Sequence, residues 1–159
     1  MIAMAPLSKT GNTQFLTFGL GGETFAIPVM MVRDILDALP VTDVPTARAF
    51  ANGLINVRGR VVPLVDPRLK LGMQPAPPTV DTRFVVIETE VDGEATIVAL
   101  RTDKVHEVAE LDVLVAEEAP RIGMRWRPEL IRAIGRRNNR FIMILDIGRV
   151  LSSAETADS

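Results

Sequence analysis

The stretch from Leu54 to Leu71 constrains the fold more than any other part of the chain. Residues 54–57 are strand-like, and Arg58-Gly59-Arg60 then makes the chain turn, because glycine takes a positive φ at little cost. The apolar, largely β-branched run 61–65 predicts a second strand that is buried on both faces. Asp66-Pro67 predicts an N-cap with proline at the first helical position. The stretch therefore predicts two strands around a tight turn that exposes two arginines.

Two more hairpins are predicted on either side of this stretch. Extended residues flank Gly21-Gly22 and Asp92-Gly93, and both dipeptides suit two-residue primed turns. Residues 29–36 predict a short helical turn that leads into a strand, and residues 47–53 predict a helix ended by a glycine. The proline-rich segment 74–79 predicts a linker on the surface.

A short pattern occurs twice in the chain. Ile55-x-x-x-Gly59-Arg60 before Leu64-Val65-Asp66 is echoed by Ile131-x-x-x-Gly135-Arg136 before Ile144-Leu145-Asp146. This alignment pairs Gly59 with Gly135 and gives the second copy a longer, polar tip at 136–139. Each unit is too small to bury a full core alone, so we expect two similar β units that pack together.

The composition excludes most catalytic chemistry. The chain has 159 residues with one histidine, no cysteine and no tyrosine, so a catalytic triad or a histidine-rich metal site would depend on His106 alone. We therefore expect no enzyme activity, no cofactor and no metal. No apolar run is long enough to span a membrane, and a net charge of −2 gives no general reason to expect nucleic acid. Without cysteine or a secretory signal, we expect a cytoplasmic protein.

Several motifs together resemble the chemotaxis coupling protein family, CheW, and the CheW-like regulatory domain of the CheA histidine kinase. The most specific is I-N-V-R-G-R-V-V-P-L-V-D-P-R-L-K-L-G at Ile55–Gly72. The supporting matches occur in the family's order and spacing: Phe15 to Phe18, F-A-I-P-V-M-M-V-R-D-I at Phe25 to Ile35, F-x-N-G-L at Phe50 to Leu54, and R-x-I-M-I-L-D-I at Arg140 to Ile147. The resemblance covers roughly residues 14–151.

The resemblance implies a mainly β fold of two SH3-like, five-stranded β-barrel subdomains over a shared core. Residues 14–151 would form one CheW-like domain, with the linker near 74–79, between a flexible tail at 1–13 and a fraying C-terminus at 152–159. The family's role is non-enzymatic: it holds a CheA-type histidine kinase and methyl-accepting chemoreceptors in one array at the membrane. One surface binds the kinase's regulatory domain, and a groove between the subdomains takes the receptor's cytoplasmic tip.

The resemblance also assigns receptor-binding positions. Arg58 matches the arginine of the family's N-x-R-G motif, which contacts the receptor. Arginine suits this role because its planar guanidinium makes paired hydrogen bonds to carboxylates and carbonyls. Asp34 matches an acidic position at the groove, and Phe84 and Val85 match the apolar strand that faces the receptor. Arg60 gains no such assignment.

Three further positions are implied at other contacts. Val32 and Gly53 match a kinase or receptor interface, and a side chain larger than glycine at 53 should disturb that surface. Ile122 lies near the loop through which the family joins kinase and coupling protein into rings. Glu117 stands where some relatives carry a basic residue, so ring contacts of that form are open.

Other interpretations of the same residues stay open. An adaptor of a pilus-type or other chemosensory pathway is the related alternative, and a small nucleic-acid-binding β-barrel is the alternative of another class. The arginines of the 121–140 region motivate the latter, although Trp126 is the only aromatic residue within that region. Asp66 and Asp146 each precede a helical turn and are interpreted as caps rather than a catalytic pair, and His106 as an exposed histidine.

Overall fold

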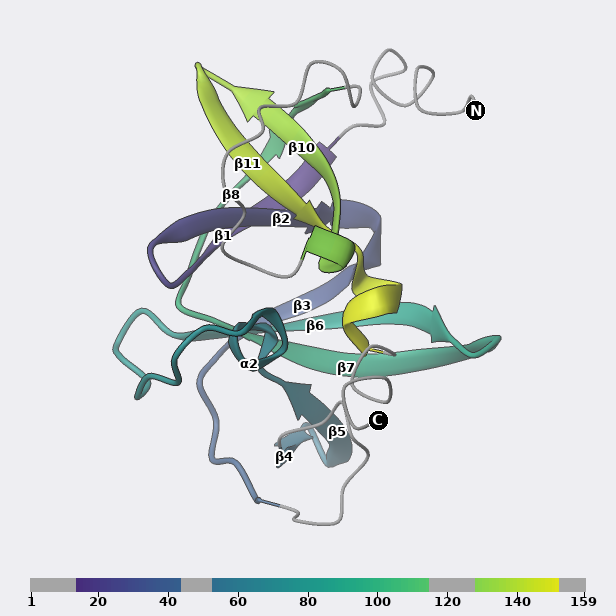
Figure 1. Ribbon diagram of the computed structural model, residues 1–159. Helices are drawn as coiled ribbons and strands as arrows, with labels where there is room; N and C mark the ends of the chain where they lie inside the picture. The colour runs from purple at the N-terminus through teal and green to yellow at the C-terminus, as the bar shows by residue number, and fades with distance from the viewer. Residues whose placement is uncertain (1–13, 44–52, 115–127, 152–159) are drawn as a thin grey trace.

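The computed structural model describes residues 14–43, 53–114 and 128–151, and these residues form two curled β-sheets, one above the other in Figure 1. The six-stranded sheet has the order β8-β1-β2-β11-β10-β9, and the five-stranded sheet has the order β3-β6-β7-β5-β4. The first sheet comprises β1 (Gln14–Leu20), β2 (Glu23–Pro28), β8 (Lys104–Glu110), β9 (Asp112–Val113), β10 (Ile131–Arg137) and β11 (Arg140–Leu145). The second comprises β3 (Val32–Asp37), β4 (Gly53–Val57), β5 (Arg60–Val65), β6 (Arg83–Val91) and β7 (Glu94–Thr102).

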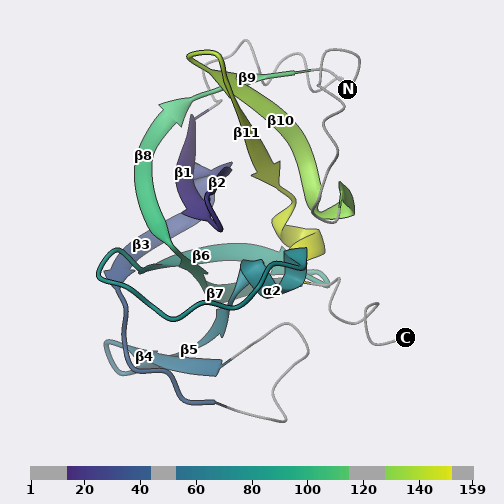
Figure 2. The same ribbon diagram turned by 60° about the vertical axis from the view of Figure 1, so that its left-hand side comes forward.

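The chain starts in the six-stranded sheet, builds the whole five-stranded sheet, and then returns. The first crossing is the 3-10 turn η1 (Val29–Met31), and the second is the short connection between β7 and β8. Figure 2 shows β8 rising from the lower sheet to the upper one. The mainly β fold with two SH3-like halves is confirmed. The very short β9 gives one sheet a sixth strand.

Four hairpins have two-residue turns in which both central residues take a positive φ. The turn residues are Gly21-Gly22, Arg58-Gly59, Asp92-Gly93 and Asn138-Asn139. Positive φ at both positions defines the type I′ turn, whose twist matches that of the flanking strands. The predicted primed turns at Gly21-Gly22 and Asp92-Gly93 are therefore confirmed.

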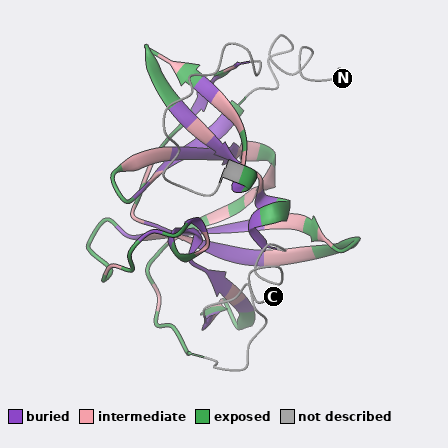
Figure 3. Ribbon diagram, in the orientation of Figure 1, coloured by how far each residue is buried: buried purple, intermediate pink, exposed green. Residues whose placement is uncertain are grey.

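The middle parts of β6 and β7 are apolar because both of their faces are buried. In β6, Val85 and Ile87 belong to the core between the two sheets, whereas Phe84 and Val86 point into the five-stranded half. Phe18 and Phe25 stack in the shared core, with ring centroids 6.5 Å apart. Figure 3 shows buried strand segments where the sheets face each other and exposed hairpin tips. The shared core makes the two halves one folding unit.

The repeated pattern is a repeated hairpin, with a different alignment from the predicted one. Gly53 pairs with Leu64 in β4–β5, as Ala133 pairs with Ile144 in β10–β11. The two registers then agree pair by pair up to the turns, Arg58-Gly59 and Asn138-Asn139. The predicted equivalence of Gly59 and Gly135 is wrong, because Gly135 lies inside β10 and makes room for Leu111.

Each repeated hairpin leads into an N-capped helical turn, as predicted. The backbone N–H of Arg68 donates to the Asp66 carboxylate at 3.0 Å, at the start of α2 (Pro67–Leu71). In the same way the N–H of Arg149 donates to Asp146 at 3.0 Å, at the start of the helical residues 147–151. Both aspartates are caps, so the alternative of a catalytic carboxylate pair has no support in their geometry.

Three other predictions need correction. Gly53 does not cap a helix: it is the first residue of β4 and lacks the positive φ of such a cap. The helix predicted before it falls on residues 44–52, outside the described residues. Val61 is 64% exposed, so β5 is not buried on both faces along its whole length. Segment 74–79 does form a surface connection, but it joins α2 to β6 within one sheet and does not link the two halves.

A cluster of charged groups ties the two halves together on one side of the core. The Arg68 guanidinium of α2 binds one oxygen of the Asp103 carboxylate. The other oxygen accepts the backbone N–H of Gly21 at 2.8 Å, and the Asp103 N–H donates to the carbonyl of Gly19 at 2.9 Å. Because Arg68 and Gly21 belong to different halves, Asp103 helps fix the relative position of the two halves.

In the part of the chain that the structure describes, no helix is long and apolar enough to cross a membrane.

Candidate protein-binding site

Arg58 stands at the tip of the β4–β5 hairpin in a backbone conformation that arginine rarely adopts. Its φ is +53°, and the following Gly59 has a φ of +84°. The side-chain oxygen of Asn56 accepts the Gly59 N–H at 2.7 Å and so stabilises the turn. A non-glycine residue in this region costs on the order of 1 kcal/mol, and such strain is concentrated at functional sites. The turn therefore makes Arg58 a candidate contact residue.

Asp34 of β3 holds the Arg58 side chain across the barrel. Arg58 Nη1 lies 2.8 Å from Asp34 Oδ2, while the other carboxylate oxygen accepts the Ile35 N–H at 2.9 Å. The Arg58 side chain is still 75% exposed, against 29% for Asp34. An exposed pair of this kind contributes at most about 1 kcal/mol to stability. The carboxylate orients the guanidinium and leaves most of its N–H groups available to a partner.

A shallow groove of about 360 Å³ lies beside this hairpin. It forms where Thr42 pairs with Leu54 through two backbone hydrogen bonds of 2.9 and 2.8 Å, which close the five-stranded sheet into a barrel. Its lining is mostly apolar: Leu39, Pro40, Thr42, Leu54, Ile55, Asn56 and Val61. The exposed Val61 stands on the strand that leaves the Arg58 turn. The arginine and the groove can therefore be contacted by one partner.

Gly53 keeps the closure of this barrel tight. A Cβ atom added to it would lie 2.6 Å from Val41 Cγ1 and 2.9 Å from the carbonyl oxygen of Thr42. The second contact is with backbone, so a side chain at 53 would displace the segment that forms one wall of the groove. This agrees with the expectation that a residue larger than glycine at position 53 disturbs this surface. The effect of such a residue on binding stays a prediction.

The other residues assigned from the resemblance lie away from this surface. Phe84 is 2% exposed and Val85 is not exposed at all: Phe84 packs in the core of the five-stranded half and Val85 in the core between the sheets, so neither can touch a partner in this conformation. Val32 is half-buried against the shared core. Ile122 falls outside the described residues. Of the assigned set, the structure brings Arg58 and Asp34 together, whereas Gly53 lies at the other end of β4.

Sequence reasoning missed the groove wall at Leu39, Pro40 and Thr42, and the exposure of Val61. The wall depends on a pairing between Thr42 and Leu54, which are distant in sequence, and no local pattern predicts such a pairing. The exposure of Val61 could have been predicted, because Arg60 and Val61 are the first two residues of a strand that directly follows a tight turn. There a side chain on the outer face of the barrel meets solvent.

Asp66 is a buried carboxyl at the start of α2. Burial raises the pKa of the Asp66 carboxyl; the charge of Arg101 and the backbone N–H of Arg68 partly counter this. Arg101 Nη1 lies 3.9 Å from Asp66 Oδ2. Among the described residues, no three histidine, aspartate or glutamate side chains are grouped closely enough to hold a metal ion. His106 is exposed on β8, as predicted.

Comparisons with known proteins agree with this architecture. The sequence model of the CheW-like domain matches residues 14–155 of the chain. A probable chemotaxis protein CheW of Rhizobium etli is 30% identical over 146 residues, which cover 92% of each chain. The chemotaxis protein CheW of Klebsiella aerogenes is 30% identical over 161 residues, covering 99% of this chain and 95% of the relative. The crystal structure of the scaffolding protein TtCheW from Thermoanaerobacter tengcongensis superposes with a TM-score of 0.72 at 20% identity, covering 89% of this chain and 93% of the other.

Proposed function

Because this chain belongs to the CheW-like domain family and is a chemotaxis coupling adaptor, we propose that it joins methyl-accepting chemoreceptors to a CheA-type histidine kinase. We also propose that it works without a catalytic step, in the cytoplasm, at membrane-associated receptor arrays. The observation that carries the proposal is Arg58, held 75% exposed on a strained turn beside an apolar groove.

The chemistry of this surface suits a helical receptor tip. The free N–H groups of Arg58 would donate to a carboxylate or a helix-end carbonyl of the receptor. The groove beside it would take an apolar side chain against Leu54 and Val61. Asp34 would keep the guanidinium in place before binding, which lowers the entropy lost when the complex forms. Phe84 and Val85 are buried side chains of β6 and are not among the proposed contacts.

The test replaces Arg58 by alanine and measures receptor-dependent activation of the kinase in a reconstituted mixture of all three proteins. We expect receptor-dependent activation to weaken. The reason is that the affinity for the receptor falls roughly ten- to a hundredfold when a charged hydrogen-bond partner is lost. Arg60→Ala is the matched control, since Arg60 is an exposed arginine at the other side of the same turn. Unchanged coupling in Arg58→Ala, with a normal melting temperature, would remove the proposed contact surface.

A further inference from the structure

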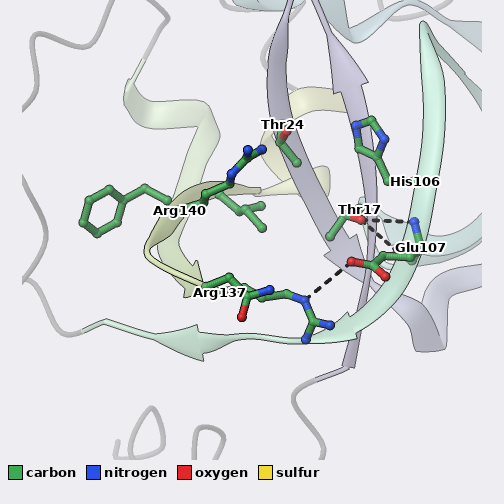
Figure 4. A pocket seen from close by; sticks show the side chains of 9 residues that line it. Thr17, Thr24, His106, Glu107, Arg137 and Arg140 are labelled. Carbon is green, nitrogen blue, oxygen red and sulfur yellow. Dashed lines mark hydrogen bonds and ion pairs between the residues drawn. The ribbon is translucent and has the colours of Figure 1, made fainter.

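The six-stranded half has a larger hollow at the corresponding end of its own barrel. Its volume is about 540 Å³, and five strands and one turn contribute to its wall. The lining residues are Thr17, Thr24, His106, Glu107, Arg137, Asn138, Arg140, Phe141 and Ile142. Figure 4 shows Arg140 on the side of Thr24 and Arg137 on the side of Glu107. None of these residues takes part in the surface around Arg58.

The charges in this hollow leave one arginine available. Arg137 Nε lies 3.5 Å from Glu107 Oε2, and Arg137 Nη1 donates to the carbonyl of Glu110 at 3.4 Å. The Arg140 side chain makes no hydrogen bond or ion pair with the residues that the structure describes, and it is exposed. Two arginines against a single carboxylate give the lining a net positive charge, which favours a negatively charged group beside Arg140.

An exposed aromatic ring borders the same hollow. Phe141 is 46% exposed, whereas the neighbouring Ile142 is buried below it. Phe141 occupies the position in β10–β11 that Val61 occupies in β4–β5, since Arg136 pairs with Phe141 as Asn56 pairs with Val61. Both side chains line the hollow of their own barrel. The fold therefore places at the hollow of each barrel an exposed apolar side chain that directly follows an arginine in the sequence.

We propose that the hollow around Arg140 is a second protein-binding site, which takes a short acidic segment of a partner protein. A carboxylate of that segment binds the Arg140 guanidinium, and an adjacent apolar side chain packs on Phe141. A polypeptide fits this lining better than a nucleic acid. Among the lining residues Phe141 is the one phenyl ring, whereas single-stranded nucleic acids stack successive bases on several aromatic side chains.

The test measures binding of a fluorescent peptide of glutamate and phenylalanine to the full chain by fluorescence anisotropy. We expect Arg140→Ala to weaken binding about tenfold, because a charged hydrogen bond is lost. Arg60→Ala is the matched control: Arg60 opens β5 as Arg140 opens β11, and we expect it to leave the affinity unchanged. A second pair, Phe141→Ser against Val61→Ser, tests the apolar contact in the same way.

Two further probes decide the chemistry of the ligand. A peptide with glutamine in place of glutamate, and a single-stranded thymidine oligonucleotide, are both expected to bind more weakly than the acidic peptide. Amide chemical shifts should change at His106 and Phe141 and stay constant at Arg58. Absence of binding, equal losses in Arg140→Ala and Arg60→Ala, or preference for glutamine or for the oligonucleotide would overturn the proposal. None of these results bears on the Arg58 surface, which the coupling assay tests separately.

Discussion

The β4–β5 and β10–β11 hairpins share a register, a turn type and an N-capping aspartate, yet they place their arginines differently. In β4–β5 one arginine, Arg58, is inside the turn, strained, and oriented by Asp34, while Arg60 flanks the turn as Arg140 does in the other hairpin. In β10–β11 two asparagines take the turn, and the arginines flank it as the last residue of one strand and the first of the next. Asparagine tolerates this turn conformation better than arginine. The backbone is thus duplicated, while the residues around each turn give each barrel its own surface chemistry.

The surroundings of the two hairpins differ as well. Gly53 at the start of β4 is covered by the segment that carries Val41 and Thr42, which closes its barrel. At the corresponding position of β10, Ala133 carries a Cβ, although its barrel is closed in a similar way: β9 pairs with β10, and the Leu114 N–H donates to the carbonyl of Ile134 at 2.9 Å. The same position therefore excludes a methyl group in one barrel and accepts it in the other.

The largest expected effect follows from this difference. Gly53→Ala should lower the free energy of unfolding by about 1–3 kcal/mol, because the new Cβ meets backbone that must move. The reverse change, Ala133→Gly, should cost only about 0.5–1 kcal/mol through backbone entropy. Urea denaturation of both variants measures the difference. Equal losses in the two variants would mean that the closing segment is not packed as described.

Much of the fold could be predicted because its signals are local. Glycine and Asp-Gly turns predicted two of the hairpins, and Asp66-Pro67 predicted a capped helix, since each depends on residues next to one another. The alignment of the repeated units failed because it gave weight to Gly135. That glycine makes room for Leu111 in a neighbouring strand, and no local pattern shows such a contact.

The candidate site was predictable only in part, for the same reason. Arg58 was predicted from a turn signal and a family motif, and both depend on neighbours in sequence. The groove depends on the pairing of Thr42 with Leu54, and the burial of Phe84 and Val85 depends on packing between the sheets. An apolar strand that looks like a contact surface in the sequence is, in this fold, a strand with two buried faces.

A smaller effect is expected at the two caps. Burial raises the pKa of the Asp66 carboxyl above its ordinary value of 3.8, so the folded protein holds this proton at higher pH than the unfolded chain. The stabilising contribution of this group is therefore full at low pH and is lost as the pH rises through the raised pKa.

Asp66→Asn keeps a capping oxygen and should remove this part of the pH dependence. Asp66→Ala should in addition cost about 1 kcal/mol through loss of the cap. Unfolding free energies measured between acidic and neutral pH test both changes, with Asp146→Asn as the control for removing a cap charge. An unchanged slope in Asp66→Asn would contradict the assignment.

The smallest effect on stability is expected at the turn itself, where Arg58→Asn gives β4–β5 a turn residue of β10–β11. Relief of the positive-φ strain and loss of the Asp34 ion pair have opposite signs and similar size, so stability should change by less than about 1 kcal/mol. Receptor-dependent kinase activation should nevertheless fall as far as in Arg58→Ala, since asparagine carries no charge and reaches less far.

Thermal unfolding and the coupling assay, run on the same Arg58→Asn sample, separate the two roles of the residue. A large loss of stability would mean that Arg58 is kept for the turn and that its exposure is incidental. Normal coupling with normal stability would mean that the receptor contacts the apolar groove and Val61 rather than Arg58. The expected combination, normal stability with lost coupling, requires that the strained arginine is kept for its partner, because the fold itself is satisfied by asparagine in the corresponding turn.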